Sequence, residues 1–81
     1  MNIQKAVRKA VEMNGYITGT EHFKNKVFIK PTDTKDLCIC CVNKDHSRRG
    51  WQPCASDLIA DDWDAISEEE FLSLSMQNNL F

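Results

Sequence analysis

The first apolar positions of the chain recur with helical spacing. They fall at i, i+3, i+4, i+7 and i+8, and they are Ile3, Ala6, Val7, Ala10 and Val11. This spacing places one apolar stripe along an amphipathic helix. Asn14-Gly15 follows, a pair that readily adopts the left-handed conformation in which helices end. The pattern therefore predicts a helix from Ile3 to Met13.

The middle of the chain changes to short β-forming runs separated by turn residues. Strands are predicted over residues 16–20 (YITGT) and 27–30 (VFIK), with a turn over 21–26 between them and turn residues at 31–34. Residues 36–43 (DLCICCVN) form a continuous run rich in β-formers, which is typical of a strand buried on both faces. Residues 44–50 are predicted to be a polar loop.

The last third of the chain predicts two more helical segments around a final strand. Ser56 is predicted to cap a short helical turn over 57–61, and residues 63–66 (WDAI) to form the last strand. Ser67 and Glu70 have the spacing of a capping box, ahead of a short apolar face. Residues 77–81 are predicted to fray or to dock on a neighbour.

These elements indicate one α+β domain over residues 1–81. We expect an N-terminal amphipathic helix packed on a small antiparallel β-sheet, a short helical turn before the last strand and a short C-terminal helix. An 81-residue chain buries a small core, so oligomerisation is expected to stabilise it. No apolar run approaches the roughly 20 residues that span a bilayer, and the N-terminus does not resemble a signal peptide. We therefore expect a cytoplasmic protein with reduced cysteines and no membrane partner.

Charge is distributed unevenly along the chain. Residues 1–54 carry 10 basic and 5 acidic side chains, whereas residues 55–81 carry 7 acidic side chains and no basic one. The basic footprint of a protein that binds long nucleic acid is missing, since the sequence pI is about 5.6. The two parts could attract each other within one chain or between chains.

The cysteines are candidate zinc ligands. Cys38, Cys40, Cys41, His46 and Cys54 follow the spacing C-x-C-C-x4-H-x7-C, whereas structural zinc sites usually present C-x2–4-C on a tight turn. In a strand, the first two cysteines share one face and the third points to the other. Buried free thiols without metal are the favoured interpretation.

Two arrangements of side chains could in principle be catalytic. Cys54 could pair with His22 or His46 as an activated nucleophile, but such pairs are defined by geometry rather than by sequence distance. Four acids lie close together in the sequence, at Asp57, Asp61, Asp62 and Asp64. Aspartate is common next to helical turns for capping reasons alone, so a solvated acidic surface is the favoured interpretation.

The tryptophans have different surroundings. Trp63 opens the last strand behind an apolar segment and is predicted to lie in the core. Trp51 lies between the basic loop and Pro53, where its indole could stack on a planar ring. Arg48 and Arg49 could pair with phosphates, and Asp57 could accept hydrogen bonds from a ribose or an exocyclic amine. Together these residues indicate a small nucleotide-type pocket.

The order of residues over 51–66 resembles the C-terminal signature of a family of small phage proteins, the Thoeris anti-defense 2 family. The signature is carried by Trp51, Pro53, Ser56, Asp57, Leu58, Ile59, Ala60, Asp61, Asp62, Trp63 and Ile66. The opening of the chain is similar too, with a short helix, a loop ending at Gly15 and a strand. The resemblance covers residues 1–66, and residues 67–81 are an extension.

The resemblance implies a sponge rather than an enzyme. Members of the family bind cyclic nucleotide immune signals, such as cyclic ADP-ribose isomers or cyclic dinucleotides, and hold them without cleaving them. They are compact α+β domains that assemble into dimers and tetramers, with pockets between subunits. We therefore expect phage counter-defence in the host bacterial cytoplasm, a homodimer or homotetramer, and no cofactor. The alternative is a phage or mobile-element accessory protein that acts by protein–protein interaction.

The site that these arguments predict combines the pocket residues with the family positions. The family has an Arg and then a Trp shortly after the first strand, where this chain has Gly19 and then Phe23 or His22. Lys26 is a further candidate for a phosphate contact. The expected ligand-binding residues are Trp51, Asp57, Phe23, Arg48, Arg49, Lys26 and Ser56.

Overall fold

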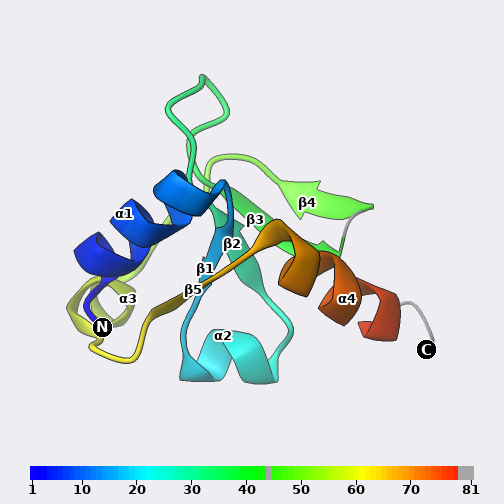
Figure 1. Ribbon diagram of the computed structural model, residues 1–81. Helices are drawn as coiled ribbons and strands as arrows, with labels where there is room; N and C mark the ends of the chain where they lie inside the picture. The colour runs from blue at the N-terminus through cyan, green and yellow to red at the C-terminus, as the bar shows by residue number, and fades with distance from the viewer. Residues whose placement is uncertain (44, 79–81) are drawn as a thin grey trace.

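The computed structural model describes residues 1–43 and 45–78 (Figure 1). Along the chain the elements are α1 (Ile3–Met13), β1 (Tyr16–Thr18), α2 (Thr20–Lys24), β2 (Phe28–Lys30), β3 (Ile39–Asn43), β4 (His46–Arg48), α3 (Ala55–Ile59), β5 (Asp64–Ile66) and α4 (Glu68–Asn78). The strands form a five-stranded antiparallel sheet in the order β4-β3-β2-β1-β5. The expected α+β class is confirmed.

The two longest helices lie on opposite faces of the sheet, as Figure 1 shows. Helix α1 packs on β1 and β5, and α4 packs on β3. Because alternate residues of a strand point to opposite faces, each strand contributes to both layers. In β1, Ile17 faces α1 while Tyr16 faces α4.

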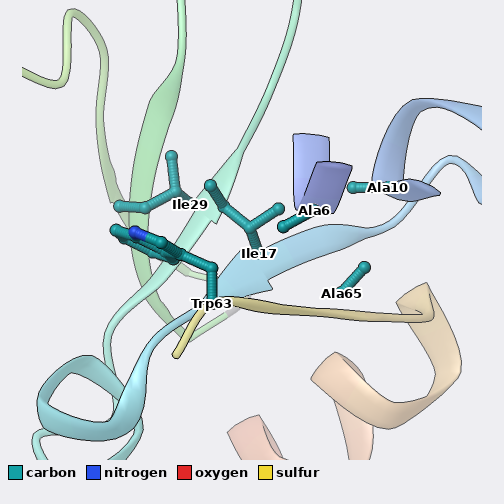
Figure 2. Packing of buried hydrophobic residues seen from close by; sticks show 6 residues of the cluster. All are labelled: Ala6, Ala10, Ile17, Ile29, Trp63 and Ala65. Carbon is teal, nitrogen blue, oxygen red and sulfur yellow. The ribbon is translucent and has the colours of Figure 1, made fainter. Parts of the chain in front are cut away.

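The core under α1 is built from small residues on the helix and large ones on the sheet. Ala6 and Ala10 are fully buried, and their short side chains bring the helix close to Ile17, Ile29 and the 1% exposed Trp63 (Figure 2). The helix begins at Asn2, whose side-chain oxygen accepts a hydrogen bond from Lys5 N at 2.9 Å, and ends at Asn14 in the left-handed conformation. The sequence prediction for this helix is confirmed at both ends.

The core under α4 is aromatic. Phe71 of α4 stacks on Tyr16 with ring centroids 4.0 Å apart, and it meets Phe28 edge to face at 5.6 Å. Ser67 Oγ accepts a hydrogen bond from Glu70 N at 3.1 Å, so the predicted serine cap is present. The helix continues through Asn78, so residues 77 and 78 are helical, and residues 79–81 lie outside the described part of the chain.

Four predictions about local structure were wrong. The first error is the boundary between the first strand and the turn that follows it: β1 ends at Thr18, and α2 begins at Thr20 after the extended Gly19, so part of the predicted turn over 21–26 is helical. Part of the predicted loop over 44–50 is β4, which pairs with β3. The run over 36–43 is not buried on both faces: β3 starts only at Ile39, and Val42 is 42% exposed because α1 covers β1 and β5 instead.

The fourth error concerns the cap of α3. Cys54, not Ser56, is the residue before the first turn, and Asp57 completes a reciprocal cap with it. The helix therefore starts two residues earlier than the serine indicated. Helix α2 connects β1 to β2, and α3 lies between β4 and β5, the two edge strands of the sheet.

Gly15 allows a close approach to the backbone of Ile66. A Cβ atom at this position would lie 2.1 Å from the backbone oxygen of Ile66, which is far inside van der Waals contact. At Gly19 the nearest atom to a Cβ would be 3.5 Å away, an ordinary contact. We therefore expect Gly15→Ala to lower the free energy of unfolding by about 1–3 kcal/mol, as overpacking does, while Gly19→Ala leaves it within about 0.5 kcal/mol of wild type. Urea titration measures both, and equal stability of the two variants would contradict the packing described here.

Candidate functional site

A cleft of about 190 Å³ lies between the two short helices α2 and α3. It is lined by Gly19, Thr20, Glu21, His22, Ser56, Asp57, Ala60, Asp62 and Trp63. Three segments far apart in the sequence therefore meet here: the turn after β1, helix α3, and the turn before β5. The residues that hold these segments together also form the walls of the cleft.

Two aspartates anchor the short helices and at the same time line the cleft. Asp57 Oδ2 accepts hydrogen bonds from Cys54 N at 2.9 Å and Cys54 Sγ at 3.2 Å, at the start of α3. Asp62 Oδ2 accepts from Thr20 N at 3.2 Å, at the start of α2. Each carboxylate thus uses the same oxygen, Oδ2, for a helix cap.

His22 forms one wall of the cleft. The centroid of its ring lies 4.8 Å from that of the Trp63 indole ring, and the two planes are tilted by 33°. Its Nε2 lies 3.4 Å from Asp57 Oδ1, which makes an ion pair when the histidine is protonated. Trp63 is fixed in turn by its Nε1–H, which donates to the backbone oxygen of Asp57 at 2.7 Å.

The two aspartates are held in their charged form. Burial alone would raise the pKa of Asp57, but the hydrogen bonds from Cys54 and the attraction of His22 outweigh it and leave the pKa below its ordinary value. Hydrogen bonds from the side chain and backbone of Thr20 lower the pKa of Asp62. The cleft is therefore anionic at neutral pH.

A second, more open groove of about 370 Å³ adjoins the cleft and shares Gly19, Thr20 and Asp62 with it. Phe23 lines this groove and is 43% exposed, and its ring meets Phe28 edge to face. Lys26 Nζ lies 4.9 Å above the same ring, at a cation–π distance. Cleft and groove thus form one continuous concave surface around the first turn of α2.

The structure brings together only part of the predicted site. Ser56 and Asp57 line the cleft, Phe23 lines the adjoining groove, and Lys26 lies over the Phe23 ring. Of the two residues that could take the family's Trp position, His22 is the one beside Asp57. His22 is absent from the ligand-binding residues that the sequence predicts, and its alignment with the family's Trp position is the signal that points to it.

The basic loop and Trp51 lie elsewhere. Arg49 Nη1 pairs with Asp36 at 3.3 Å, and Arg48 lines a separate hollow with Cys40 and neighbouring residues of β3 and β4. Trp51 is half-buried against the core under α1 and meets Trp63 edge to face at 6.0 Å. Its backbone N donates to Cys38 O at 2.8 Å, which fixes the chain where it leaves β4.

The cysteines are not gathered at one place. All four are free thiols, and Cys40 and Cys41 pack in the cores on opposite faces of the sheet. Burial raises the pKa of Cys41 to about 11, so this thiol stays protonated at neutral pH. Within residues 1–43 and 45–78, no three histidine, cysteine or acidic side chains are placed to hold a metal ion.

Comparison with known proteins gives one match. The family model of the Thoeris anti-defense 2-like domain matches residues 1–66, which include both helices that frame the cleft. The chain belongs to the Thoeris anti-defense 2-like family. No curated protein and no solved structure matches it.

Membership in the Thoeris anti-defense 2-like family suggests anti-Thoeris activity for this protein and implies that it binds an immune signal molecule. The matched region ends at Ile66, so α4 lies outside it. In the described part of the chain, no helix is long and apolar enough to cross a membrane.

The lowered pKa values predict acid sensitivity. A carboxylate whose pKa is lower in the folded state than in the unfolded state contributes stability above its unfolded pKa, and this contribution is lost as pH falls through the folded value. Since the ordinary value is 3.8 for both Asp57 and Asp62, we expect the free energy of unfolding to fall as the pH drops below about 4. Asp57→Asn should show a shallower fall, and Asp61→Asn, outside both caps, should follow the wild type. Urea titrations from pH 7 to pH 3 measure this, and parallel curves for Asp57→Asn and the wild type would contradict it.

Proposed function

We propose that this protein binds a cyclic nucleotide immune signal and holds it without cleaving it, as a phage counter-defence protein. The ligand is a cyclic ADP-ribose isomer or a cyclic dinucleotide. The family match over residues 1–66 is the observation that carries this proposal. The concave surface of cleft and groove supports it, because it combines an aromatic wall with hydrogen-bond acceptors, the features that orient a nucleotide.

The charge of the cleft indicates what else such a ligand requires. No lysine or arginine is among the described residues that line the cleft. The phosphates of a cyclic nucleotide therefore need cations from outside it. We assign this role to Lys26, Arg48 and Arg49, supplied from the rim or from a second copy of the chain. The second copy would also supply Trp51, to stack on the face of the base that the cleft wall leaves open.

A homodimer or homotetramer is part of this proposal. Helix α3 borders the cleft and exposes two neighbouring apolar side chains, Leu58 and Ile59, the second of them 79% exposed. Exposed apolar residues that adjoin a binding site favour a protein contact. A second copy seated on this face would close the cleft and bring its own cations close to the ligand.

The same surface supports the second candidate function. An exposed apolar pair on α3 beside an acidic turn could bind a host protein instead of a second copy. This protein–protein interaction role predicts no affinity for cyclic nucleotides. The two functions are therefore separated by adding cyclic ADP-ribose isomers and measuring the melting temperature.

The central experiment tests sequestration directly. The protein is incubated with a cyclic ADP-ribose isomer, freed of unbound ligand and heated, and the released compound is analysed by mass spectrometry. We expect intact ligand at the input mass and a higher melting temperature in its presence. Recovery of a hydrolysed product would show an enzyme, and the absence of any retained ligand or shift for cyclic ADP-ribose isomers and cyclic dinucleotides would contradict the proposal.

Substitution of the two tryptophans separates binding from stability. Stacking on an aromatic side chain contributes about 1–3 kcal/mol per base, so Trp51→Ala should weaken ligand binding by about tenfold or more, since about 1.4 kcal/mol is one decade. Trp63→Ala should lower the free energy of unfolding by about 3–5 kcal/mol, because Trp63 is 1% exposed. Calorimetric titration and urea unfolding measure the two effects. Unchanged affinity in a folded Trp51→Ala variant would remove Trp51 from the site.

Assembly is tested on the exposed face of α3. Light scattering at micromolar concentration should show a dimer or a larger species for the wild type. Ile59→Asp should shift it towards the monomer, because a charge would be buried in the contact. Val11→Asp is the matched control, since Val11 is an exposed valine near the end of α1. A wild-type monomer, or the same loss of assembly in both variants, would contradict the proposed contact.

A further inference from the structure

Gly19 is not required by the backbone at its position. Its φ of −109° and ψ of 178° are extended values that any residue adopts. A Cβ atom there would lie 3.5 Å from His22 Nδ1, 3.7 Å from Asp62 Oδ1 and 3.7 Å from Trp63 Cε3, all ordinary contact distances. Neither strain nor overlap within the chain therefore accounts for the glycine.

The missing side chain would point into the cleft. The three residues that a Cβ would meet are all part of its lining. Glycine at this position leaves open the space that any other residue would occupy between His22, Asp62 and Trp63. This space is bounded on one side by the ring of His22, which rests on Trp63 at 4.8 Å.

The polar atoms around this space are mostly hydrogen-bond acceptors. Asp57 and Asp62 each use Oδ2 to accept the backbone N–H that caps a helix. Asp57 Oδ1 lies 3.4 Å from His22 Nε2, longer than a typical hydrogen bond, and Asp62 Oδ1 is one of the atoms facing the Gly19 position. A ligand group that donates hydrogen bonds would satisfy both oxygens.

The charge of the lining selects against an anion. Glu21, Asp57 and Asp62 are acidic, and His22 is the one basic residue among the described residues of the lining. A phosphate in this cleft would face carboxylates at close range and would displace no counter-charge. An uncharged group with hydroxyl or amino donors meets complementary acceptors instead.

We propose that Gly19 and His22 determine the specificity of this cleft, which takes the uncharged nucleoside portion of a ligand, its ribose hydroxyls and base, and excludes phosphate. The inference deepens the proposed function, on which it rests. Gly19 provides the room, His22 and Trp63 provide a flat wall, and the two Oδ1 atoms receive the donors. The phosphates of the ligand then lie outside the cleft.

The test uses three probes on the full chain: adenosine, adenosine 5′-monophosphate and inorganic phosphate. Nuclear magnetic resonance titration follows the backbone amides of Thr20 and His22 and the indole N–H of Trp63. We expect adenosine to shift these signals, the monophosphate to bind no more tightly than adenosine at low salt, and inorganic phosphate to leave them unmoved. Cleft shifts with inorganic phosphate at lower concentrations than with adenosine, or no shifts with adenosine, would overturn the inference.

Substitutions in the cleft test which of its residues determine the affinity for adenosine. Gly19→Val fills the open space, and its effect on adenosine affinity should be a loss of about tenfold or more, with the melting temperature close to that of wild type. His22→Ser removes the wall and should weaken adenosine binding, whereas His46→Ser, the matched change on β4, should not. Wild-type affinity in a folded Gly19→Val variant, or equal losses in the two histidine variants, would overturn the roles assigned to these residues.

The result is separable from that of the sequestration experiment. If adenosine occupies the cleft as described but no cyclic nucleotide is retained, the proposed function fails while the specificity of the cleft stands. If a cyclic ADP-ribose isomer is retained and Gly19→Val and His22→Ser bind it as tightly as wild type, the proposed function stands and the inference about the cleft is overturned.

Discussion

The burial of Trp63 is the constraint on which the rest of the structure depends. Its ring is the largest fully buried side chain, and it lies beneath α1 against the central strands β1 and β2. Its one polar atom is satisfied by the backbone oxygen of Asp57, which ties α3 to the start of β5. Since a buried indole N–H without a partner would be costly, the position of α3 is coupled to the packing of the core.

The cleft follows from the same residue. His22 rests on the Trp63 ring, and Asp57 and Asp62, which both precede that tryptophan in the sequence, cap two different helices. The carboxylates that stabilise the short helices are therefore also the polar groups of the cleft. A substitution of either aspartate changes both stability and the chemistry of the site, so binding data on such variants require a stability measurement beside them.

Much of the architecture could be predicted from periodicity. The stripe of α1 and its ends at Asn2 and Asn14 follow from local sequence, and the family signature over residues 51–66 identified the region that frames the cleft. The sequence was a poorer guide to which residues form the site. Arg48 and Arg49 looked like pocket residues because they precede Trp51 in the sequence, yet the pairing of β4 with β3 places them at the far edge of the sheet from β5.

The sequence by itself determined the α+β class, the N-terminal helix, the core position of Trp63 and the family. These depend on local periodicity, helix-capping chemistry and the order of residues within one short segment. Only the tertiary structure decided that His22 rather than Phe23 stands beside Asp57, that Cys54 caps α3, and that Gly19 opens onto the cleft. The surroundings of His22 and Gly19 depend on contacts between segments separated by tens of residues, whereas the cap of α3 is a local choice between Cys54 and Ser56 that the sequence pattern assigned to the serine. No local pattern encodes how α2, α3 and the turn before β5 meet around one buried tryptophan.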